Sequence, residues 1–144
     1  MIDTKVTPYP QTPAEVAAAV LDGIEANEAA FSMHYWVRTP VRSPFTPDDE
    51  PACGTTMCAA GWVAHVTGWT LVDLPEDADE VDLTSRDEDG FEYETSAGTY
   101  AQRGGERRLI SDVARDALGL REHNTFWNVT GETALRRLRE IAGR

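Results

Sequence analysis

Two cysteines give this chain its clearest chemical potential. Cys53 and Cys58 lie five residues apart and could supply two ligands to a zinc ion. A structural zinc site needs four ligands. His65 falls on the same helical face as Cys58 but two turns further on, about 10 Å along the helix axis, which is a long reach for one shared ion. We therefore expect no bound metal ion and no cofactor; the candidate ligands, should a zinc ion bind, are Cys53, Cys58 and His65.

The same cysteines could instead act as thiols. We expect Cys58 in the first turn of a helix, where the helix dipole favours the thiolate form. Cys53 lies across a glycine turn, so a disulfide with Cys58 is geometrically feasible. A catalytic pair of Cys58 with His65 is not, because two helical turns separate the side chains. We expect no catalytic residues, and a thiol- or zinc-dependent protein built on Cys53 and Cys58 is one alternative function.

A dense run of acids is the second chemical feature. Residues 73–94 hold eleven Asp and Glu side chains against Arg86 alone, and so contribute ten of the 12 net negative charges. Such a charge run is typical of a solvated loop. Because complementary charges steer association, this loop is the predicted binding surface for a protein partner. Its candidate binding residues are Glu76, Asp77, Asp79, Glu80, Asp82, Asp87, Glu88 and Asp89.

The acidic balance also bears on the class of protein. A sequence pI near 4.5 argues against direct nucleic-acid binding, which needs cations to neutralise phosphates. An acidic surface can instead imitate those phosphates, so an acidic DNA-mimic inhibitor of a DNA-binding protein is a further alternative. No apolar run is long enough to span a membrane. The N-terminus shows no basic segment followed by an apolar one, so we expect a cytoplasmic protein with reduced cysteines.

Helices are predicted to position these residues. Thr12 and Glu15 form a capping-box pattern at the start of the first helix. Gly119 followed by Leu120 is a strong stop signal for the third, and Thr130 is a suitable cap for the fourth. The predicted helices span residues 13–30, 58–69, 109–118 and 131–142.

The second of these helices is predicted to be central. Thr55 or Thr56 can cap it, and Gly68 is expected to end it. The segment between them has no polar face, which is typical of a helix buried on all sides. We therefore expect the other three helices to pack around it.

These patterns predict a mainly α fold, with one compact helical domain over residues 1–144. Residues 1–11 form an N-terminal arm, and residues 73–94 form the acidic loop. The alternation of aromatic and polar residues allows one short β-hairpin near residues 91–101. Long irregular loops are expected at residues 38–54 and 70–105. Loops of that length are unusual unless they carry a function, so the functional surface is expected to lie in them.

Four short motifs carry a resemblance to a known group of proteins. The motifs are Phe31/Met33/Trp36, the C-G-T-x-x-C-x-x-G-W pattern of residues 53–62, the helix end Leu118-Gly119-Leu120, and the aromatic pair Phe126-Trp127. In them the chain resembles a family of small, uncharacterised proteins from actinobacteria and their bacteriophages. The resemblance implies a phage or mobile-element origin, where small proteins often act by binding a host protein.

Taken together, these features favour a non-enzymatic protein-interaction or regulatory protein that binds a host protein. The reasons are the uncharged core motif, the lack of a recognisable catalytic constellation in the sequence, and the long loops. The acidic stretch is not part of the family pattern, so any role for it would be particular to this chain.

Overall fold

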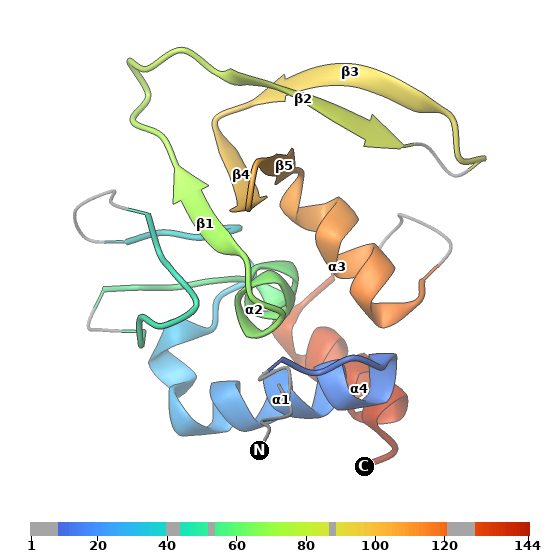
Figure 1. Ribbon diagram of the computed structural model, residues 1–144. Helices are drawn as coiled ribbons and strands as arrows, with labels where there is room; N and C mark the ends of the chain where they lie inside the picture. Colours follow the sequence, from blue (N-terminus) through green and yellow to red (C-terminus); the bar gives the residue numbers. More distant parts are fainter. Residues whose placement is uncertain (1–8, 40–43, 52–53, 87–88, 121–128) are drawn as a thin grey trace, which may run out of the picture.

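The computed structural model describes residues 9–39, 44–51, 54–86, 89–120 and 129–144. These residues form four α-helices and five β-strands (Figure 1). The helices are α1 (Pro13–Ala26), α2 (Ala59–Val66), α3 (Ile110–Leu118) and α4 (Gly131–Ala142), with a 3₁₀ turn at Glu28–Ala30. The strands are β1 (Thr70–Asp73), β2 (Val81–Arg86), β3 (Glu92–Ala97), β4 (Thr99–Arg103) and β5 (Glu106–Arg108).

The fold is α+β, so the expectation of a mainly α domain is wrong. One antiparallel sheet has the strand order β1-β4-β5, and a second antiparallel sheet consists of β2 and β3. The predicted acidic loop at 73–94 is wrong as well, because it contains all of β2 and the start of β3. The hairpin expected near 91–101 does not form there, since β3 and β4, on either side of Gly98, belong to different sheets.

The sequence of β2 explains why no strand is predicted there. Leu83 and Ser85 are buried, whereas Asp82, Thr84 and Arg86 are exposed. This is the period of two expected of a half-buried strand, but only one of these two buried residues is large and apolar. The surrounding acids hide so weak an alternation, and the segment then resembles a solvated loop.

The predicted caps of the first and last helices are confirmed. The Thr12 hydroxyl accepts a hydrogen bond from the Glu15 N–H, and the Glu15 carboxylate accepts one from the Thr12 N–H. The Thr130 hydroxyl accepts from the Thr133 N–H at the start of α4. Helix α1 ends at Ala26, earlier than expected, and the chain continues as the 3₁₀ turn.

The caps of the middle helices are partly as predicted. Gly119 adopts a left-handed φ of 68°, and the Leu120 N–H donates back into α3, so the predicted stop signal is confirmed. The cap of α2 is Cys58 rather than either threonine. Thr56 is engaged elsewhere, because its backbone exchanges both hydrogen bonds with Arg38.

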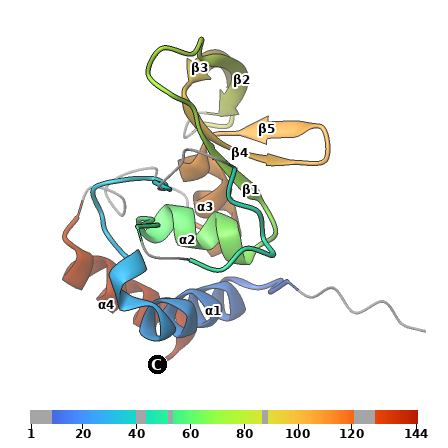
Figure 2. The same cartoon turned by 90° about the vertical axis from the view of Figure 1, so that its left-hand side faces the viewer.

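Helix α2 lies at the centre of the molecule, as predicted. It contacts α1, α3, α4 and β1, and its residues from Ala59 to Ala64 are all buried. The β2–β3 pair lies at the opposite end of the molecule from α1 and α4, as both views show (Figures 1 and 2). Among the described residues, no helix combines the length and apolarity needed to cross a membrane.

Candidate functional site

The thiol of Cys58 faces the interior of the protein. The residue is 4% exposed, and its sulfur is free of any disulfide. Burial raises the pKa of the Cys58 thiol to about 11, and backbone N–H groups at the start of α2 offset this only in part. Desolvation therefore outweighs the helix dipole that was expected to favour a thiolate. Cys53, the other candidate thiol, lies outside the described residues.

His65 lies near the other end of α2 and is packed among aromatic rings. Its ring centroid is 4.6 Å from that of Phe45 and 6.1 Å from that of Trp62. Its Nδ1 atom is buried with no hydrogen-bond partner. Burial lowers the pKa of His65, and the carboxylate of Asp49 opposes this more weakly. Across the parts of the chain that the structure describes, no three His, Cys, Asp or Glu side chains are grouped to hold a metal ion.

Within the motif of residues 53–62, the described residues 58–62 have a structural role that the sequence did not reveal. The Cys58 N–H donates to the Tyr35 carbonyl at 2.8 Å, and the Trp62 indole N–H donates to the Ala30 carbonyl at 3.2 Å. A Cβ at Gly61 would lie 2.0 Å from the carbonyl oxygen of Trp36, so only glycine fits there. The motif therefore holds the segment 30–38 against the start of α2.

The held segment presents two aromatic side chains to solvent. Tyr35 is 43% exposed and Trp36 is 38% exposed, although both lie in a segment fixed through its backbone. The Arg38 guanidinium stacks on the Tyr35 ring at 4.8 Å from its centroid. Exposed aromatic rings on a fixed backbone are typical of binding surfaces, because they add contact area at little entropic cost.

The structure describes six of the eight predicted partner-binding acids, and all six are exposed. The turn that joins β1 to β2 brings four of them together, namely Glu76, Asp77, Asp79 and Glu80. Asp82 lies on β2, and Asp89 lies beyond the far end of that strand. Asp87 and Glu88 are outside the described residues. Four of these acids are thus gathered in one turn, and the other two lie apart from it, on β2 and beyond its end.

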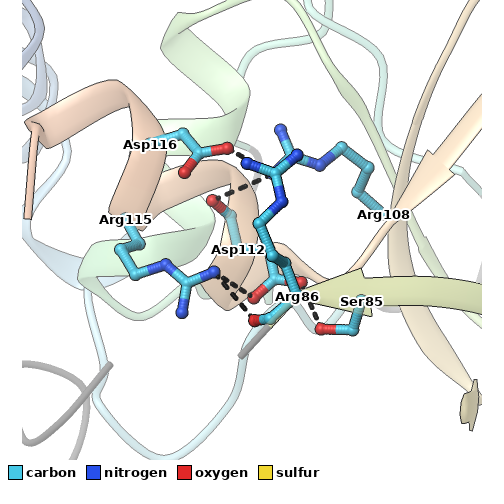
Figure 3. Close-up of polar contacts among 6 residues, drawn as sticks. All are labelled: Ser85, Arg86, Arg108, Asp112, Arg115 and Asp116. Atoms are coloured by element: carbon cyan, nitrogen blue, oxygen red, sulfur yellow. Dashed lines mark hydrogen bonds and ion pairs between the residues drawn. The ribbon is translucent and has the colours of Figure 1, made fainter. Parts of the chain in front are cut away.

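A buried polar network anchors these strands to the helices (Figure 3). The Ser85 hydroxyl on β2 donates to the carboxylate of Asp112 on α3. The same carboxylate pairs with Arg115 at 3.3 Å, and both charged residues are 6% exposed. Arg115 also donates to the backbone carbonyl of Arg86 at 3.1 Å. A buried charge is tolerated only when paired and hydrogen-bonded, and here each partner fixes β2 to α3.

The network continues toward the surface through a second arginine. Arg108, at the end of β5, pairs with the carboxylate of Asp116 and reaches the backbone carbonyl of Asp112. These contacts join β5 to α3, which the Ser85 and Arg115 contacts in turn join to β2 (Figure 3). A groove of about 550 Å³ opens above them, between β2–β3 and the β4–β5 hairpin. Its lining is strongly polar and includes both acids and arginines.

The sequence did not single out this network. Asp112 and Arg115 fall three residues apart in a helix that was predicted correctly, which is the spacing of an exposed surface pair. Nothing in their spacing shows that they are buried, because that follows from the strand laid across them. A correct assignment of β2, with Ser85 pointing inward, is the signal that could have found them.

The strand pair also exposes two aromatic side chains of its own. Phe91 is 69% exposed and Tyr93 is 48% exposed. They lie at the start of β3, close in sequence to Asp89, Glu92 and Glu94. We call residues 74–86 and 89–97, which comprise the β1–β2 turn, β2 and β3, the acidic arm. The arm combines exposed aromatic area, dense negative charge and a firm anchor.

Comparison with known proteins adds no further assignment. No protein family, no curated protein and no solved structure matches this chain. The resemblance to actinobacterial and phage proteins therefore stays a prediction.

Proposed function

We propose that this chain is a non-enzymatic interaction protein that binds a partner protein through the acidic arm. The observation that carries the proposal is the exposure of Phe91 and Tyr93 on an acidic strand pair that is fixed to α3 by buried contacts. Large exposed aromatic residues contribute much of the binding energy in protein interfaces. Surrounding charges contribute chiefly to the association rate and to the choice of partner.

The anchoring network supports a binding role in a second way. A surface that is ordered before it binds loses less conformational entropy on association than a loop that must be ordered by its partner. The Ser85–Asp112–Arg115 contacts hold β2 in place from beneath. The partner that fits such a surface is a protein with a basic patch and an apolar spot at its centre.

The alternative that used a thiol or zinc has less support. The Cys58 thiol is buried, and its pKa of about 11 keeps it protonated at neutral pH. His65 packs against Phe45 and Trp62 at the opposite end of the helix from Cys58. Both side chains thus pack in the core.

Site-specific cross-linking in lysate of a candidate host tests the proposal. A photoreactive phenylalanine derivative replaces Phe91 in one protein and the exposed Ala14, on α1, in a matched control. We expect one stoichiometric cross-linked protein from position 91 and none from position 14. Neutralising the arm by Asp82→Asn, Glu92→Gln and Glu94→Gln should lower the yield. Equal products from both positions, or none from position 91, would contradict binding through the arm.

The identity of the cross-linked protein also decides the DNA-mimic alternative. If the partner binds DNA, and duplex DNA competes with the cross-link, then the arm imitates phosphates. If DNA has no effect, the partner recognises the arm as a protein surface.

A further inference from the structure

A second groove lies at the base of the acidic arm, on a different side from the polar one above the network. It encloses about 480 Å³. The segment 34–38 forms one wall, and the end of β1 with the turn that follows forms the other. Gly98 and Thr99, between β3 and β4, complete it. The volume is large enough for a long side chain and part of the backbone that carries it.

The first wall is aromatic and held in position. It carries Tyr35 and Trp36, whose backbone carbonyls are fixed by the N–H of Cys58 and by close packing on Gly61. Arg38 exchanges two backbone hydrogen bonds with Thr56 at the end of the same wall. The stacking of Arg38 on Tyr35 shows that a cation already rests on one ring of this wall. Trp36, on the same wall, is 38% exposed, and an indole can bind a cation in the same way.

The second wall is acidic and also fixed. The Asp73 carboxylate accepts from the Thr99 hydroxyl at 2.9 Å, and the Glu80 carboxylate accepts from the Ser96 hydroxyl at 3.0 Å. Glu76 lines the groove as well, and makes no hydrogen bond or ion pair with the described residues. Among the described residues that line the groove, three carboxylates therefore accompany a single guanidinium, that of Arg38.

We propose that this groove takes a lysine or arginine side chain from a basic, extended segment of a partner protein. The groove is complementary to a cation, because Trp36 lines one of its walls and Glu76 lines the other. Aromatic faces and carboxylates both attract cations, and the attraction grows where the groove removes water. The proposal rests on the proposed function only in naming a protein as the occupant.

Titration calorimetry of the purified full chain with an acetylated hexalysine peptide tests the groove. The titration is run at about 150 mM salt, where long-range attraction is largely screened. Trp36→Ala should lower the affinity by about fivefold or more, the scale of one cation–π contact. Phe91→Ala removes an exposed aromatic residue from the arm instead, and should leave the affinity within about twofold.

A matched pair of charge variants separates the groove from general attraction. Glu76→Gln with Glu80→Gln removes two charges from the groove, and the amide oxygen introduced at position 80 can still accept from Ser96. Glu92→Gln with Glu94→Gln removes two charges from the outer face of the arm. We expect the first pair to weaken hexalysine binding severalfold more than the second. Equal losses would overturn the proposal, because they would show attraction to net charge alone.

The groove can be tested even if Trp36→Ala does not fold. Should its circular dichroism show unfolding, Glu76→Lys at an exposed position takes its place, and this variant should abolish binding. Binding that survives Glu76→Lys would overturn the groove. Failure here leaves cross-linking at Phe91 untouched, so the groove and the proposed function can fail separately.

Discussion

At the scale of single residues, the side chains with the most reactive chemistry serve the core. The Cys58 sulfur is buried, and its pKa of about 11 makes it a poor nucleophile at neutral pH. His65 likewise contributes ring area next to Phe45 and Trp62. In both residues, burial in an apolar site disfavours the charged form of the side chain.

His65 should make stability depend on pH in a defined direction. Burial lowers its pKa below the ordinary value of 6.5, so the unfolded chain binds this proton more readily than the folded one. The contribution of neutral His65 to the free energy of unfolding is complete above the pKa that the residue has in the unfolded chain. It is lost as the pH falls through the pKa of His65 in the folded chain. Urea denaturation should show a loss of unfolding free energy toward acid pH that is reduced in His65→Gln, by at most about 1.4 kcal/mol per pH unit.

The exposed His34 provides the control for this prediction. His34→Gln removes a histidine from the surface by the same substitution. If His34→Gln and His65→Gln flatten the pH profile equally, then burial of His65 is not the cause. Carboxylates titrate lower, and they contribute equally to both variants.

At the scale of elements, the close contact between α2 and the segment 30–38 is the first to test. A Cβ on Gly61 would meet the Trp36 carbonyl oxygen, a backbone atom that cannot move without shifting the whole segment. Gly61→Ala should therefore lower the free energy of unfolding by about 1–3 kcal/mol. Gly105→Ala, where a new Cβ meets nothing within 4 Å, should change it by less than about 0.5 kcal/mol. Similar values for both would show that the segment yields easily.

The anchor between β2 and α3 is the second element to test. Asp112→Ala leaves Arg115 buried without its partner, and should cost about 3–5 kcal/mol of unfolding free energy. Ser85→Ala removes one hydrogen bond to a charged group, and should cost about 2 kcal/mol. Asp116→Ala breaks only the more exposed pair with Arg108, and should cost less than about 1 kcal/mol.

Hydrogen exchange distinguishes an anchor from a general stabiliser. In Ser85→Ala, amides of β2 and β3 should exchange faster, whereas those of α1 and α4 should keep their protection. Uniform acceleration across the molecule would contradict a local anchoring role, because it would report only the loss of global stability.

The elements also show what the sequence could and could not reveal. Helix caps depend on residues within four positions of one another, so Thr12 with Glu15 and Gly119 with Leu120 could be recognised directly. The strands depend on distant partners: β1 pairs with β4 across residues that no local pattern connects. The anchor beneath β2 requires both the pairing of β2 with β3 and the packing of β2 against α3. The acids were found because charge is visible in composition, but their arrangement along two strands was not.

At the scale of the whole molecule, most of the net negative charge lies at one end of the structure. The acidic arm occupies one end, and α1 and α4 occupy the other (Figure 1). Ten of the 12 net negative charges lie in residues 73–94, most of which belong to this arm. Charges of one sign held close together repel each other more in the folded chain than in the expanded unfolded chain. The arm therefore lowers the stability of the fold that carries it.

Salt should relieve this repulsion. Raising sodium chloride from about 20 mM to about 300 mM shortens the screening length to less than the width of the arm, so the melting temperature should rise. In a variant with Glu76→Gln, Asp77→Asn and Asp79→Asn the rise should be smaller, because three of the repelling charges are gone. Salt also weakens attractive pairs such as Arg144–Asp22 and Arg108–Asp116. A melting temperature that falls with salt would show that these attractions outweigh the repulsion in the arm. It would contradict the expectation that the acids of the arm destabilise the fold.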